Sequence, residues 1–291
     1  MRSPIHRSIA VRALRNIART EEPISVLTLG LWAVRAKDSS RKTQIYKTIT
    51  NLARKATIPQ ALVIYALFEQ GTKSATKALQ KAMEISKPVV KPTLIDAFMP
   101  DTLPAPWLEY ADIMIKEKNH SEARRALKIG TEEYNSPEAY LRLAQYAFND
   151  GDMNLYEQCL AKSAMAGNVD SAYLLGNLYL AVHLRTSKPN IPIRVNPKDF
   201  RSKYPWEDYR RMAQEWYEIA LAGGKGTAGL VLAGLCRRDG KKIAYAKGYL
   251  DVALDDPVSS EKAMTVVDQW SNANWRIDIL EDLIKENTSK F

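Results

Sequence analysis

The side chains that most often carry catalysis or bind metals are few in this chain. It contains three histidines, His6, His120 and His183, and two cysteines, Cys159 and Cys236. No spacing among them matches the paired ligands of a zinc site, and a catalytic Cys–His pair stays open only if folding brings two of them together. We therefore expect no cofactor, no metal site and no enzyme activity. Each cysteine lies among apolar residues and is expected to be a small buried hydrophobe.

Two short motifs match ligand-binding loops only in part. Gly223-Gly224-Lys225-Gly226-Thr227 is rich in glycine, but the G-x-x-x-x-G-K-[ST] pattern of a phosphate loop and a preceding strand are missing. Asp150-Gly151-Asp152 lacks the further ligands and the distal glutamate of a calcium loop. Both stretches lie between helical patterns, so we interpret them as turns between helices.

Basic side chains form the strongest candidate for a binding site. One group lies between residues 35 and 55, and a second lies in the proline-rich stretch 183–205. Phosphates of RNA or an acidic protein surface would suit either group, and solvated surface is the alternative interpretation. The candidate partner-binding residues are Arg41, Lys42, Lys47, Arg54 and Lys55 in the first group, and Arg185, Lys188, Arg194, Lys198, Arg201 and Lys203 in the second.

The excess of positive charge belongs to the N-terminal third of the chain. The formal net charge is +9, and residues 1–20 contain five arginines and no acid. Residues 23–100 hold 12 lysines and arginines against 4 acids, whereas residues 101–291 hold 25 against 27. This near-neutral remainder argues against a nucleic-acid groove that runs along the whole chain.

Residues 1–20 are typical of a mitochondrial transit peptide. They are rich in arginine and free of acids, and Arg12, Arg15 and Arg19 fall on one side of a helical wheel while apolar residues fall on another. The expected location is the mitochondrial matrix or the matrix face of the inner membrane; an ordinary basic tail is the alternative. The apolar runs 24–34 and 61–68 are shorter than the roughly 20 residues that span a bilayer. We expect no transmembrane segment, and peripheral membrane contact stays open.

The rest of the chain is predicted to be all-α, a solenoid of antiparallel helical hairpins. Apolar residues recur at helical spacing between short turns, and no sustained alternation of period two indicates strands. A small residue at each crossing would let the two helices of a hairpin approach closely, and the hairpins would stack because none covers its apolar face alone. The repeating positions are Leu143-Ala144, Leu175-Gly176 and Leu232-Ala233, preceded four residues earlier by Ala139, Ser171 and Ala228.

Two stretches resemble one family of helical repeats. NVDSAYLLGNLYL at 168–180 looks like the first helix of a SEL1-like repeat, a relative of the tetratricopeptide repeat, and AQEWYEIALAG at 213–223 looks like its second helix. The resemblance covers about residues 104–257. It departs from the family at the 183–205 insertion and at Asp256, where the family has glycine. It implies a scaffold or adaptor that binds other proteins, with no catalytic residues to transfer.

Three parts are therefore expected along the chain. Residues 1–20 are the transit peptide, residues 21–100 an N-terminal basic helical region, and residues 101–291 a SEL1/TPR-like array with an insertion at 183–205. Residues 259–287 are expected to add one or two helices, with Trp270 and Trp275 covering the last face. The expected function is a mitochondrial protein–protein interaction scaffold, assembly factor or peripheral subunit of a larger complex. The alternative is an RNA-associated factor of mitochondrial gene expression that uses the basic helices and the insertion.

Overall fold

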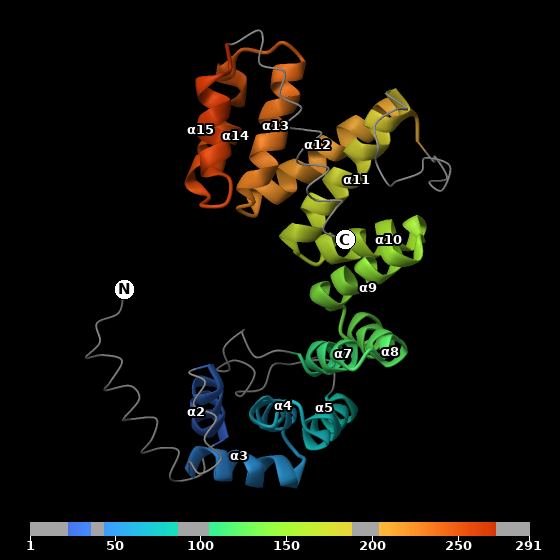
Figure 1. Cartoon of the computed structure of the whole chain (residues 1–291), viewed down its shortest axis with the longest axis vertical. Helices are drawn as coiled ribbons and strands as arrows, with labels where there is room; N and C mark the ends of the chain where they lie inside the picture. Colours follow the sequence, from blue (N-terminus) through green and yellow to red (C-terminus); the bar gives the residue numbers. More distant parts are fainter. Residues whose placement is uncertain (1–22, 36–43, 87–104, 188–203, 272–291) are drawn as a thin grey trace, which may run out of the picture. The chain divides into compact units, whose positions relative to one another are not determined.

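The computed structural model describes residues 23–35, 44–86, 105–187 and 204–271 (Figure 1). These residues form thirteen α-helices and no strand, and helices that follow one another in sequence pack in succession. The predicted all-α fold of stacked helical hairpins is confirmed. The chain divides into two compact units, Met1–Tyr134 and Asn135–Phe291.

The first unit has six described helices. Their bounds are α2 Pro23–Arg35, α3 Gln44–Lys55, α4 Pro59–Phe68, α5 Lys73–Ile85, α7 Pro106–Lys116 and α8 His120–Glu132. Helices α4 and α5 form one hairpin and α7 and α8 form another, while α2, α3 and α4 pack against one another. The hairpin α4–α5 lies within the N-terminal basic helical region that we predicted for residues 21–100.

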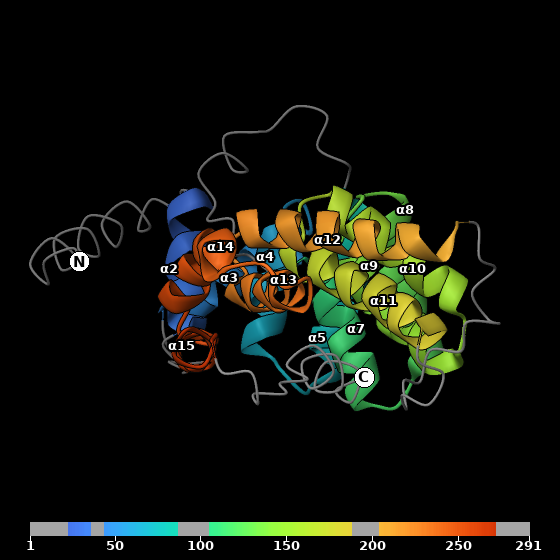
Figure 2. The ribbon, with the colours of Figure 1, turned by 90° about the horizontal axis from the view of Figure 1, so that it is seen from above.

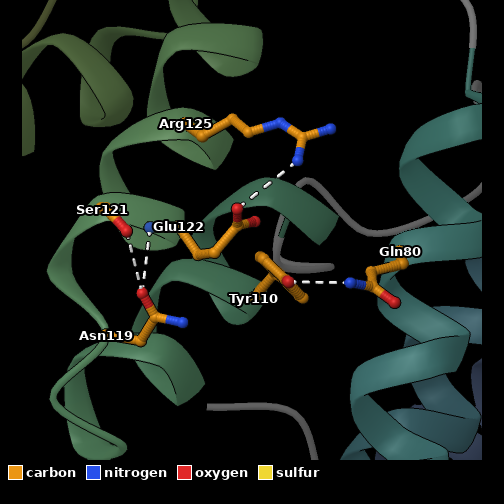
Figure 3. Close-up of polar contacts among 6 residues, drawn as sticks. All are labelled: Gln80, Tyr110, Asn119, Ser121, Glu122 and Arg125. Carbon is orange, nitrogen blue, oxygen red and sulfur yellow. Dashed lines mark hydrogen bonds and ion pairs between the residues drawn. The ribbon is translucent and has the colours of Figure 1, made fainter.

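The start of α8 shows how local side chains set a helix boundary. The Oδ1 of Asn119 accepts hydrogen bonds from the backbone N–H of Glu122 at 3.3 Å and from the hydroxyl of Ser121 at 3.1 Å (Figure 3). Such a cap satisfies a donor that the first helical turn leaves unpaired. Glu122 also forms an ion pair with Arg125 at 3.4 Å. His120 is the first residue of α8.

Helices α5 and α7 pack against each other although residues 87–104 separate them in sequence. The Nε2 of Gln80 donates a hydrogen bond of 2.8 Å to the hydroxyl of Tyr110 (Figure 3). Tyr110 and the adjacent Ala111 of α7 are both buried. The basic helices and the first repeat-like hairpin therefore share one packed unit.

The second unit has seven described helices. Their bounds are α9 Pro137–Asp150, α10 Met153–Met165, α11 Val169–Ser187, α12 Trp206–Ala222, α13 Gly226–Arg238, α14 Ile243–Asp255 and α15 Ser260–Asp268. Three hairpins, α9–α10, α11–α12 and α13–α14, pack in succession, and the helices of the middle pair lie side by side in Figures 1 and 2. One apolar core runs through all of them.

Glycines close the turns between these helices. Gly151 follows α9 with φ +80°, and Gly224 follows α12 with φ +89°, a backbone conformation that L side chains rarely adopt. Both predicted turns are present but shorter than the motifs: Gly223, Gly224 and Lys225 separate α12 from α13, and Gly151 and Asp152 separate α9 from α10. Gly226 and Thr227 already belong to α13, and Asp150 ends α9.

The small residues of the repeat lie where helices touch. Ala144 and Ala233 are fully buried, and a Cβ on Gly176 would come within 2.7 Å of the Tyr217 ring. A Cβ on Gly229 would overlap the backbone carbonyl oxygen of Tyr249 on α14. The close approach that we predicted for the hairpin crossings is therefore present in both the α11–α12 and the α13–α14 pairs.

Polar side chains add directional contacts inside this core. Tyr217 is fully buried, and its hydroxyl donates a hydrogen bond of 2.9 Å to the Oδ1 of Asn177. Ser171 donates at 2.7 Å to the hydroxyl of Ser163, which donates at 2.6 Å to the carbonyl of Pro137. These bonds join α11 to α12, α10 to α11 and α9 to α10. A buried polar group without such a partner would cost free energy, so they favour one register of packing.

The middle hairpin is longer than its neighbours. α11 has 19 residues and α12 has 17, against 13 or 14 in the other helices of the three hairpins. The helix α11 continues to Ser187, so the first five residues of the 183–205 stretch are helical, and His183 and Leu184 are buried. The first part of the predicted 183–205 insertion therefore extends α11.

The packing at Gly229 generates a stability prediction. Gly229→Ala should lower the free energy of unfolding by about 1–3 kcal/mol, because the new methyl group overlaps a backbone atom that has little freedom to shift. Urea denaturation followed by circular dichroism measures the change.

Gly248→Ala is the matched control on α14, where a Cβ meets nothing within 4 Å. It should raise stability by about 0.5–1 kcal/mol through helix propensity alone. Equal effects of the two substitutions would contradict the close crossing.

Candidate functional site

The helix α3 carries the described part of the first basic group. Lys47, Arg54 and Lys55 follow at positions i, i+7 and i+8, a spacing that places them on one side of the helix. All three are exposed, and none forms an ion pair with another described residue. We call these three residues the α3 basic face. Arg41 and Lys42 lie outside the described residues.

The opposite side of α3 fixes the direction of this face. Ile49 and Leu52 are buried against α2 and α4, where Gly30 leaves room for the Ile49 side chain. Burial of such side chains stabilises by about 1.5–3 kcal/mol each. The basic face points outward because the apolar face of the same helix is held in the core.

A polar contact secures α3 to the end of α4. The hydroxyl of Tyr46 donates a hydrogen bond of 2.6 Å to Glu69, and the Tyr46 ring meets Phe68 edge-on at 5.6 Å between centroids. The bond to the Glu69 carboxylate, with burial, raises the pKa of Tyr46 above its usual value. Glu69 is only 6% exposed, so this acid is turned inward and does not pair with the α3 basic face.

A second row of cations on α5 escaped the sequence analysis. Lys73, Lys77 and Lys81 follow at intervals of four residues and are exposed. Lys81 forms an ion pair of 2.9 Å with Glu84, whereas Lys73 and Lys77 pair with no described residue. Their i, i+4, i+8 spacing is visible in the sequence, but these lysines are more widely spaced than the cations of residues 35–55 and therefore stand out less.

The basic insertion is not assembled by the described structure. Arg185 belongs to the last turn of α11, and nothing is described of its side chain. The other five candidates of this group lie outside the described residues: Lys188, Arg194, Lys198, Arg201 and Lys203. The structure therefore neither gathers nor separates these six cations.

Tyrosines gather between the middle hairpin and α10. The hydroxyl of Tyr179 donates a hydrogen bond of 2.7 Å to Glu157 on α10, and its ring lies 6.0 Å from that of Tyr209 on α12. Tyr204 meets Tyr209 edge-on at 6.3 Å. Burial, followed by the bond to Glu157, raises the pKa of Tyr179 far above its usual value. The neutral phenol of Tyr179 therefore joins α11 to α10 of the preceding hairpin.

The remaining candidates for chemistry are engaged or buried. Cys159 and Cys236 are buried free thiols, as predicted, and burial raises the pKa of both, which disfavours the reactive thiolate. Lys225, in the glycine-rich turn, donates at 2.6 Å to Asp170 and lies over the Tyr173 ring at 5.8 Å. Among the described residues, no three His, Cys, Asp or Glu side chains gather as metal ligands would.

Comparison with known proteins adds no family. No protein-family model matches the chain, and no curated protein matches it. The resemblance to a SEL1-like repeat therefore rests on the sequence of this chain alone, chiefly on the residues of α11 and α12. None of the helices in the described ranges combines the length and apolar character that a membrane span requires.

The buried Tyr179 generates a pH prediction. In the unfolded chain this phenol releases its proton near pH 10, whereas the folded chain retains it. The free energy of unfolding should therefore fall as the pH rises above 10, by up to about 1.4 kcal/mol per pH unit for each such group.

Tyr179→Phe should reduce this alkaline slope and cost about 1 kcal/mol at neutral pH through the lost hydrogen bond. Urea titrations between pH 7 and pH 11 measure both effects. Tyr245→Phe is the matched control, because Tyr245 is 69% exposed. An unchanged slope in the Tyr179 variant would contradict the assignment.

Proposed function

We propose that this chain is a protein-binding scaffold, an assembly factor or peripheral subunit of a larger mitochondrial complex. The observation that carries the proposal is the run of three hairpins, α9–α10, α11–α12 and α13–α14, packed in succession over one core. Buried small residues hold the crossings, so the outward positions are free to carry a binding surface. The SEL1-like pattern of α11 and α12 supports the same class of function.

The mechanism would be recognition by shape and charge. Arrays of helical hairpins present grooves and ridges that accept a helix or an extended segment of a partner. The α3 basic face would add an electrostatic contact to an acidic partner, since its three cations have no described ion-pair partner of their own. Because the three side chains are exposed, a partner can bind them without disturbing the buried side of α3.

The second candidate is an RNA-associated factor of mitochondrial gene expression. The observation that favours it is the same α3 basic face, together with exposed Lys73 and Lys77 on α5. Phosphate contacts of this kind release counterions, so RNA binding would weaken steeply with salt. The near-neutral composition of residues 101–291 favours protein partners for the hairpin array.

An affinity purification separates the two functions. The tagged full chain is recovered from intact mitochondria, one half of the lysate is treated with RNase, and the co-purifying proteins are identified. A defined protein set that survives RNase is the expected result. Loss of the partners after RNase would favour the RNA-associated function instead.

The triple variant Lys47→Gln, Arg54→Gln, Lys55→Gln tests the α3 basic face within that experiment. Its stability should change by no more than about 0.5 kcal/mol per exposed site, while recovery of the partner falls. The triple variant Lys241→Gln, Lys242→Gln, Lys247→Gln removes the same charge from exposed positions in the second unit and should retain the partner. Equal recovery with both variants would exclude the α3 basic face as a contact.

Import into mitochondria is tested on residues 1–20. Replacing Arg12, Arg15 and Arg19 with glutamine removes the basic side of the proposed transit peptide. The full chain should become resistant to protease added to intact mitochondria, and the variant should not. The Lys241, Lys242 and Lys247 variant controls for charge loss, and equal protection of the arginine variant would contradict the proposal.

A further inference from the structure

The last described helix has a covered face and an open apolar face. On α15, Ala263 and Val266 are buried and Trp270 packs against the core of the second unit. Met264 is 58% exposed and Val267 is 37% exposed. Met264 and Val267 are neighbours on the helix surface, three residues apart. We call these two residues the α15 open face.

The helix α13 shows what such a face meets in a complete hairpin. An offset of 35 residues aligns Ala228 of α13 with Ala263 of α15, and both are fully buried. The same offset aligns Gly229 and Leu232, which are buried, with the two residues of the α15 open face. Each of the two positions is therefore covered in α13 and uncovered in α15.

The element that covers this face of α13 is the second helix of its own hairpin. Gly229 lies so close to α14 that a Cβ would overlap the carbonyl oxygen of Tyr249. α15 packs against α14 and touches α13, so it occupies the position of the first helix of a further hairpin. Its open face is the side on which a second helix would pack.

Residues that follow α15 carry the sequence pattern of such a second helix. An offset of 124 residues aligns Ala139 of α9 with Ala263. It also aligns four buried residues of α10 with four apolar residues of the C-terminal segment: Met153 with Ile277, Tyr156 with Leu280, Cys159 with Leu283, and Leu160 with Ile284. The intervening positions of that segment are mostly charged, as a solvent-facing side requires.

The match depends on the spacing of the α9–α10 hairpin. Ala139 to Tyr156 is 17 residues, whereas Ala228 to the buried Ala246 of α14 is 18. Applied to α15, the shorter spacing places Leu280 on the covered side, and the longer spacing places Glu281 there. Burial of an unpaired carboxylate is costly, so the shorter spacing is the one that the residues favour.

We propose that residues 277–284 of the same chain cover the α15 open face, in the place that α10 has on α9. This segment begins six residues after Ser271, the last described residue, so it is tethered close to its binding face. The inference is independent of the proposed function. It means that a partner of the array binds elsewhere than on this face.

Methionine oxidation in the full chain tests the proposal directly. Hydrogen peroxide converts exposed methionines to sulfoxides, and peptide mass spectrometry gives the rate at each site. Met165 is 82% exposed and Met153 is 7% exposed, so they supply the fast and slow references in the same unit. Met264 should oxidise several-fold more slowly than Met165 and close to the rate of Met153. A Met264 rate equal to that of Met165 would overturn the proposal.

A pair of variants identifies the occupant. Leu280→Asp with Ile284→Asp should raise the Met264 rate to that of Met165 and leave Met153 slow. Ile279→Asp is the matched control, because it aligns with Leu155, which is 45% exposed, and should leave Met264 protected. Equal deprotection by both changes would count against the register. If the double variant also exposes Met153, the rates in the unsubstituted chain decide.

The molar mass distinguishes the same chain from a second copy. Size-exclusion chromatography with light scattering identifies the monomer by its molar mass. In that fraction, Met264 should stay protected from oxidation. A dimer whose Met264 loses protection on dilution would show that the covering segment comes from another copy, and would overturn the intramolecular proposal.

Discussion

The close approach of paired helices is the constraint on which the second unit depends. At Gly229 the α13 backbone lies against the Tyr249 carbonyl of α14, and at Gly176 the α11 backbone lies against the ring of Tyr217. A larger side chain at either point would push the two helices of the hairpin apart. The buried bond from Tyr217 to Asn177 then favours one register, because a shift would leave a buried polar group unpaired. The exposed positions tolerate change because the crossings do not use them.

The sequence predicted the hairpins well because their signals are local. Helical spacing of apolar residues, capping side chains such as Asn119, and glycines at positive φ such as Gly151 each act within a few residues. The extension of α11 to Ser187 was not predicted, because it depends on burial of Leu184 and on the contact between Tyr179 and Glu157 of another hairpin. Such contacts join residues that are distant in sequence, so periodicity does not reveal them.

The sequence predicted which basic residues could form a binding site, but not which of them form ion pairs in the folded chain. The cations of residues 35–55 were evident from composition, and helical spacing was enough to group Lys47, Arg54 and Lys55. The sequence did not show that Glu69, which directly follows α4, would turn inward to Tyr46 and form no ion pair with the α3 basic face. In the second unit, by contrast, Lys225 is paired with Asp170. The difference between a paired and an unpaired cation is a tertiary property, and it is what separates a structural lysine from a candidate contact.

The stacking of hairpins leaves an apolar face uncovered on the last helix of an array. Each hairpin buries its apolar faces against its neighbours, so an end helix keeps one face that no neighbouring hairpin covers. On α15 that face contains Met264 and Val267, at positions where α13 has the buried Gly229 and Leu232. An exposed apolar face of this kind favours association with other molecules, unless an amphipathic segment covers it and turns its own polar side to the solvent. The sequence at 277–286 intersperses apolar and charged residues at the spacing of an amphipathic helix, the pattern that such a covering segment needs. Covering the end would direct partner binding to the sides of the array.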